Sequence, residues 1–117
     1  MLGEIRMTRK LIRIHLFDKA RDVYAMNSHV PNTPVPGVYA TTWWRMSEEA
    51  ARSCIGAEVH LHVGQKLPSY QAGRCTGYFP VAVKGCYGLL FVEDPALAGR
   101  VQSEHWAQVQ ARVYSDL

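Results

Sequence analysis

Residues 57–63 read Ala-Glu-Val-His-Leu-His-Val, an unbroken alternation of apolar and polar side chains. Successive side chains of a β-strand point to opposite faces, so one face of this segment carries only apolar residues and the other carries Glu58, His60 and His62. Gly64 interrupts the pattern. The segment therefore predicts a strand that packs its apolar face on the core.

The same two-residue period occurs near both ends of the chain. In residues 11–16, apolar side chains alternate with Arg13 and His15. In residues 106–114, alanines and valines alternate with the polar set Gln108, Gln110, Arg112 and Tyr114. A helix is the competing prediction for 106–114, because Gln, Ala and Arg favour helices, but the strict alternation favours a strand. Three more strands are expected at 38–44, 74–83 and 87–92, where β-branched, aromatic and other apolar residues gather.

Two short helices are expected in the first half of the chain. Asp18 can cap a helix over 19–26, and Ser47 can cap another over 48–55, which Gly56 would end. Between the first helix and the strand at 38–44, residues 28–37 contain three prolines, which predicts a loop, either functional or a plain crossover. Residues 94–100 are expected to form a turn or a single helical turn.

These elements predict an α+β fold that is mainly β: a small, partly closed barrel of about six strands with two short helices. Residues 11–117 would form this single domain, after a basic leader at 1–10 that need not be ordered. The net charge is +3, and residues 1–22 account for all of it. The wide basic stripe of a strong nucleic-acid binder is not seen, which favours a solvated leader.

The location of the protein is predicted from what the sequence lacks. No apolar run suits a secretion signal or a membrane span. The three cysteines, Cys54, Cys75 and Cys86, are odd in number and show no CxxC spacing. We therefore expect a reduced, cytoplasmic protein with no membrane partner.

His60 and His62 are the first candidate site. Residues two apart on a strand point the same way, so both imidazoles could bind one metal, with Glu58 on the same face. A third ligand would come from another histidine or a cysteine; the candidate histidines are His15, His29 and His105. The alternative is a polar strand face whose histidines are hydrogen-bonded to their neighbours.

A set of aromatic and polar residues is the second candidate site. It comprises Trp43, Trp44, Arg45, Ser69, Tyr70, Gln71 and Arg74. A flat aromatic ring beside an arginine suits stacking on a nucleobase. One of the two tryptophans is expected in the core, because adjacent residues of a strand face opposite ways. No motif of a cysteine hydrolase, phosphate-binding loop or metalloprotease is present.

Several of these segments resemble the PUA-like small barrels, the group that includes ASCH and EVE domains. The matching segments are residues 43–45, residues 55–62 and residues 68–78. In that group a strand of pattern G-x-x-[IV]-x-[LF]-[HY], here residues 56–62, is followed by a G-x-[IVC]-x-G segment, here residues 73–77. The early G-x-K-x-x-x-x-R element of ASCH domains is absent. The chain is also similar to small uncharacterised bacterial proteins.

The resemblance implies a cleft beside the barrel that binds RNA or a modified nucleobase. Trp43 or Trp44 would stack on the base, and four residues would contact its edge: His62, Ser69, Tyr70 and Gln71. We therefore expect a non-enzymatic module without a cofactor that holds a nucleotide, a modified base or an RNA segment. Two alternatives stay open, a metal-dependent enzyme centred on His60 and His62 and a homodimeric interaction protein.

Overall fold

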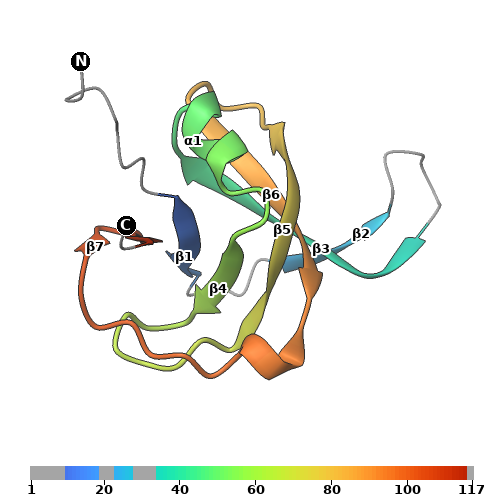
Figure 1. Ribbon diagram of the computed structural model, residues 1–117. Helices are drawn as coiled ribbons and strands as arrows, with labels where there is room; N and C mark the ends of the chain where they lie inside the picture. The colour runs from blue at the N-terminus through green and yellow to red at the C-terminus, as the bar shows by residue number, and fades with distance from the viewer. Residues whose placement is uncertain (1–9, 19–22, 28–33, 116–117) are drawn as a thin grey trace, which may run out of the picture.

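The computed structural model describes residues 10–18, 23–27 and 34–115, without the side chains of 23–27, 34–36 and Trp43. The strands in this part of the chain form one eight-stranded sheet of order β2-β3-β6-β5-β4-β1-β8-β7 (Figure 1). Their bounds are β1 Leu11–Phe17, β2 Val23–Asn27, β3 Pro34–Arg45, β4 Glu58–His62, β5 Gln71–Pro80, β6 Cys86–Glu93, β7 Trp106–Ala107 and β8 Gln110–Tyr114. β1 is parallel to β4, whereas the other neighbouring strands are antiparallel.

One α-helix, α1 (Glu48–Ser53), is present in the described residues. Ser47 caps it by accepting a hydrogen bond from the backbone N–H of Ala50, as the sequence predicts. Gly56 follows with φ of +89°, the left-handed conformation that glycine adopts without a steric penalty. The turn expected at 94–100 is a short 3₁₀-helix, η2 (Pro95–Leu97).

The hydrophobic core lies against one face of the central strands. It contains Ile14 and Leu16 from β1 and Val59 and Leu61 from β4. It also contains residues of β3, α1 with its C-cap, β5 and β6: Trp44, Ala51, Cys54, Cys75, Leu89 and Phe91. Because the described residues form eight strands and one α-helix, the prediction of a mainly β fold is confirmed.

The strand β4 is buried on both faces, which its alternating sequence did not indicate. Its apolar residues Val59 and Leu61 face the core, while His60 and His62 are also fully buried. The reason is its central place in the sheet, between β1 and β5, with the loop before β5 covering its polar face. That loop is in turn bonded to the loop after η2. The polar face of β4, which the sequence pattern would place at the surface, is therefore buried.

The structure differs from the predicted barrel in its number of elements and its closure. The sheet has eight strands and is open between its edge strands β2 and β7, and α1 is the one α-helix in the described ranges. The predicted helix over 19–26 is wrong in its second half, because Val23–Asn27 is strand β2 paired with β3. Residues 19–22 lie outside the described part of the chain.

The proline-rich segment is also more regular than predicted. β3 begins at Pro34 and includes Pro36, whereas residues 28–33 lie outside the described residues. β3 pairs with β2 from Pro34 onward but with β6 only from Val38. The prolines therefore lie where one side of β3 has no strand partner, so a missing N–H costs little there. Figure 1 shows this end of β3 extending with β2 away from the rest of the sheet.

The segment 106–114 is extended, as the alternation predicts, but it forms a hairpin rather than one strand. β7 and β8 pair through Trp106 with Ala111 and Ala107 with Gln110. Gln108 takes φ of +60° in the turn between them. Such a left-handed residue reverses the chain in a tight hairpin, and no glycine or asparagine marks it in the sequence.

The described residues contain no helix long and apolar enough to span a membrane. Of the predicted leader, only Lys10 is described.

Candidate functional sites

Three histidines form a buried cluster on the face of β1 and β4 opposite the core. His15 and His60 are neighbours in the parallel pairing of these strands, and their rings stack with centroids 4.8 Å apart. His62 lies one pleat further along β4, 5.0 Å from the His15 ring. Trp106 of β7 stands edge-on to His62 at 5.5 Å. All three imidazoles are shielded from solvent.

The hydrogen bonds fix the proton positions of His62 and His15. His62 Nδ1 lies 2.9 Å from the carbonyl oxygen of Leu67, which can only accept, so this nitrogen donates. In the neutral ring Nε2 then accepts, and it lies 2.8 Å from His15 Nδ1, which donates. His15 Nε2 is left as a buried acceptor without a hydrogen-bond partner.

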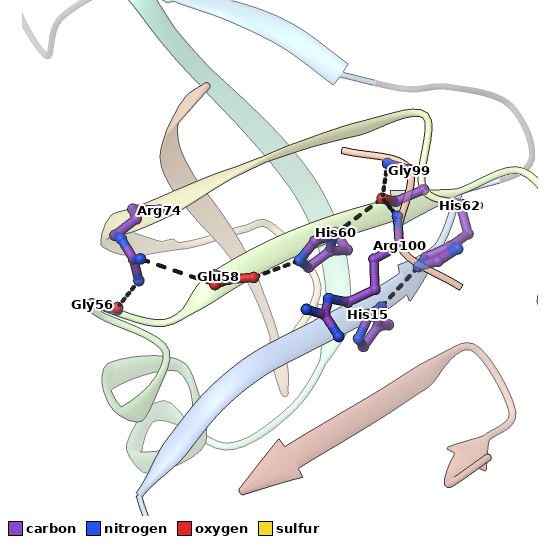
Figure 2. Close-up of polar contacts among 9 residues, drawn as sticks. His15, Gly56, Glu58, His60, His62, Arg74, Gly99 and Arg100 are labelled. Atoms are coloured by element: carbon purple, nitrogen blue, oxygen red, sulfur yellow. Dashed lines mark hydrogen bonds and ion pairs between the residues drawn. The ribbon is translucent and has the colours of Figure 1, made fainter. Parts of the chain in front are cut away.

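His60 joins a second chain of hydrogen bonds (Figure 2), through Glu58 and Ser69. Its Nε2 donates to the Glu58 carboxylate at 2.9 Å, and its Nδ1 accepts from the Ser69 hydroxyl at 3.1 Å. The Ser69 oxygen itself accepts from the backbone N–H groups of Gly99 and Arg100 at 3.0 and 3.2 Å. Ser69 therefore ties the loop before β5 and the loop after η2 to β4.

Burial keeps the three histidines neutral. It lowers the pKa of His15 to about 3, with the charges of His60, His62, Arg13 and Arg100 acting in the same direction. Burial also lowers the pKa values of His60 and His62, although their bonds to Glu58 and Leu67 oppose it.

Glu58 behaves differently from the histidines beside it. Burial opposes its ionisation, but the hydrogen bond and electrostatic interaction with His60, together with the charges of Arg13 and Arg74, hold its pKa below the ordinary value.

This cluster is not a preformed metal centre. Both nitrogens of His60 and both of His62 are already used in hydrogen bonds. Within the described ranges, no three or more His, Cys, Asp or Glu side chains are arranged to hold a metal ion. Of the candidate third ligands, His15 is the histidine that lies beside the pair, His105 is exposed, and His29 is outside the described residues. The hydrogen bonds of the cluster hold the loop before β5 against β4, and Ser69 bonds this loop to the one after η2.

The members of the predicted base-binding set whose side chains the structure describes lie in separate places rather than in one cleft. Trp44 lies in the core, and its Nε1 donates to Thr41 at 2.8 Å. The side chain of Trp43 lies outside the described part. Ser69 and His62 belong to the buried cluster.

The remaining members of that set have separate partners. Tyr70 donates to Asp18, and Gln71 donates to Glu93. The exposed Arg74 donates to the backbone oxygen of Gly56 and pairs with Glu58 at 3.9 Å. Arg45 lies elsewhere, at a cavity described below.

Two of the cysteines, Cys54 and Cys75, are not activated thiols. Burial raises the pKa of Cys54 to about 12 and that of Cys75 to about 11, so both thiols are protonated at neutral pH. Cys86 is buried as well.

A cavity of about 650 Å³ lies where the open sheet curls back on itself. One wall consists of Arg45 at the end of β3 and Cys86 at the start of β6. The other wall is the β7–β8 hairpin with the residue before it: His105, Ala107, Gln108, Val109, Gln110, Arg112 and Tyr114. Among the described residues, no carboxylate lines the cavity, and the fixed charges of its lining are the two guanidinium groups of Arg45 and Arg112.

Gln110 connects the two walls. Its Nε2 donates to the backbone oxygen of Arg45 at 2.9 Å, and its Oε1 accepts from Arg112 Nη2 at 3.1 Å. Arg45 and Arg112 form no ion pair with any residue that the structure describes. Two cations of the cavity are therefore left for a ligand.

Gln110 and Arg112 are absent from both predicted sites. Their signal was present, since they belong to the polar half of the alternation at 106–114. The sequence pattern could not show that these polar side chains face the end of β3.

Comparison of the chain with protein-family models, with curated proteins and with solved structures gives no match.

Proposed function

We propose that this protein is a non-enzymatic binding module that holds a phosphate-bearing small molecule, such as a nucleotide, in the cavity between β3 and β8. The observation that carries the proposal is the pair Arg45 and Arg112 in a cavity whose described lining residues include no carboxylate. Guanidinium groups are the side chains best suited to phosphate, because they donate several hydrogen bonds from one charged plane.

The size of the cavity supports a small-molecule ligand. Binding sites for such ligands usually measure about 300–1,000 Å³, and this cavity falls within that range at about 650 Å³. The aromatic rings of His105 and Tyr114 line it as well, and rings of this kind can pack against a nucleobase. Arg45 is the residue shared by this site and the base-binding set of the sequence.

The PUA-like interpretation of the fold is part of the same proposal. A partly closed, PUA-like barrel would have its opening beside β8, where Gln110 reaches β3. The ligand cleft would then lie at this opening rather than beside Trp44.

Isothermal titration of AMP and adenosine into the protein at pH 8 tests the proposal. We expect AMP to bind and adenosine to bind at least about tenfold more weakly, a difference of about 1.4 kcal/mol. Arg45→Met and Arg112→Met should each weaken AMP about tenfold and leave adenosine nearly unchanged. Arg74→Met is the matched control, since Arg74 is exposed and outside the cavity.

Two results would overturn the proposal. One is that AMP does not bind to the folded protein. The other is that Arg74→Met weakens AMP as much as the cavity variants do. A further titration uses a single-stranded oligoribonucleotide. If it binds much more tightly than AMP, the ligand is RNA rather than a small molecule.

A further inference from the structure

Gln110 is hydrogen-bonded to both arginines of the cavity lining, Arg45 and Arg112. It is nearly buried, at 8% exposure, in strand β8. Its side chain crosses the opening of the sheet to the last residue of β3 and also contacts Arg112, two residues along its own strand. It thus touches both residues that supply the positive charge.

The partners determine how the amide is oriented. The backbone oxygen of Arg45 only accepts hydrogen bonds, so it requires the NH₂ group. The guanidinium of Arg112 only donates, so it requires the carbonyl oxygen. A glutamine satisfies both groups at once and brings no charge. This neutrality is what leaves the two arginines uncompensated.

A carboxylate at the same place would act differently. Glutamate has the same shape, but neither of its oxygens can donate to the Arg45 backbone oxygen, and its negative charge would pair with Arg112. It would then act as an internal competitor for the phosphate of a ligand. The distinction between amide and carboxylate at residue 110 therefore affects charge selectivity.

We propose that Gln110 is the specificity-determining residue of the cavity: it orients Arg112, joins the walls and keeps the site selective for phosphate-bearing ligands. This inference rests on the proposed function, because it concerns the same cavity. The relevant quantity is the ratio of the dissociation constant for adenosine to that for AMP, which measures the share of binding due to phosphate.

Three variants test the role of Gln110. Gln110→Glu should lower the ratio about tenfold, mainly by weakening AMP. Gln110→Met removes both hydrogen bonds without adding charge, so it should lower the ratio only about threefold through loss of Arg112 orientation. Gln102→Glu is the control, since Gln102 lies outside the cavity lining and its variant adds the same charge. It should leave the ratio as in the parent.

The outcomes separate this inference from the proposed function. If the parent protein fails to bind AMP, the proposed function fails with it. If the parent discriminates but Gln110→Glu retains the ratio, only the role of Gln110 is rejected. A purely structural role would weaken AMP and adenosine alike and leave the ratio unchanged in both Gln110 variants. Should Gln110→Glu not fold, the ratio of Gln110→Met decides.

Discussion

Gly73 and Gly77 lie in the same strand, β5, but only one of them has room for a side chain. A Cβ atom at Gly73 would lie 2.1 Å from the backbone oxygen of Val92 and 2.8 Å from the Phe91 ring. At Gly77 the nearest atom would be Leu90 Cδ1 at 3.5 Å, an ordinary contact. The glycine at 73 is therefore required by the close approach of β6.

We predict that Gly73→Ala lowers the free energy of unfolding by about 2–4 kcal/mol, since the backbone of β6 must move to admit the methyl group. Gly77→Ala, the matched control, should change it by less than about 1 kcal/mol. Urea unfolding followed by circular dichroism measures both. Equal losses in the two variants would contradict the close approach seen here.

Ser69 has a structural role at the residue scale. Its hydroxyl donates to His60 and accepts from two backbone N–H groups, those of Gly99 and Arg100. Ser69→Ala leaves His60 Nδ1 and the Arg100 N–H without this partner, whereas the Gly99 N–H keeps its bond to the Ser69 backbone oxygen. We therefore expect a loss of about 2–3 kcal/mol of unfolding free energy.

The control for this variant is Ser53→Ala, which removes an exposed hydroxyl with a single bond to the Ala50 oxygen. It should cost less than about 1 kcal/mol. Amide hydrogen exchange gives a second readout: the Arg100 amide, which donates to the hydroxyl, should exchange faster in Ser69→Ala only. Unchanged exchange there would show that the hydroxyl does not hold the loop.

At the scale of elements, the pairing of β1 with β4 makes the fold sensitive to acid. The charged and titratable groups that act on His15 are Arg13 on its own strand, His60 and His62 on β4, and Arg100 from the loop after η2; β8 contributes Ala111. Glu58 of β4 is already bonded to His60. Within the described part of the chain, a proton on His15 would therefore be repelled by Arg13 and Arg100, with no carboxylate paired to it.

We predict that stability falls as the pH drops below 6.5. The pKa of His15 is 6.5 when unperturbed and about 3 in the folded protein, so between these values the unfolded chain binds more protons. The stabilisation is thus complete above pH 6.5 and is lost progressively toward pH 3. At pH 4.5, His15 alone lowers the free energy of unfolding by about 3 kcal/mol relative to its value at neutral pH. The lowered pKa values of His60, His62 and Glu58 act in the same direction.

Thermal unfolding between pH 4 and 8 measures this dependence. His15→Gln should be less stable than the parent at pH 8 but should lose less stability on acidification. His105→Gln serves as control, because His105 is largely exposed and its loss should leave the slope unchanged. An identical slope in the parent and in His15→Gln would contradict the prediction.

At the scale of the whole molecule, the open sheet is the feature with functional consequences. The cavity exists because β8 approaches β3 without pairing with it, and Gln110 bridges the remaining space. A ligand that binds both walls should therefore stabilise the folded protein as a whole.

We predict that AMP at one hundred times its dissociation constant raises the free energy of unfolding by about 3 kcal/mol. The gain should shrink in 1 M KCl, because salt screens partly exposed charges. Differential scanning fluorimetry with and without AMP measures the shift, and at the same AMP concentration the tenfold weaker variant Arg45→Met should show about half of it. A shift that is equally large with adenosine would argue against the role of the arginines.

The local order of the chain was determined by the sequence alone. The alternation at 57–63 predicted β4, Ser47 predicted the start of α1, and the mainly β class followed from the number of such segments. The helix ends at Ser53, two residues before the predicted end. These features depend on residues that are close together in the sequence, so the sequence pattern is sufficient to predict them. The helix predicted at 19–26 failed at Val23–Asn27 because pairing with β3 outweighed a local cap signal.

The sites were decided by the tertiary structure. His15 and His60 are 45 residues apart in sequence and meet because β1 and β4 are parallel neighbours. Gln110 reaches Arg45 because the sheet curls, a long-range property absent from any local pattern. The burial of His60, His62 and Trp44 likewise depends on which strands and loops cover them. Local periodicity specifies which way a side chain points, but only long-range packing specifies what it meets there.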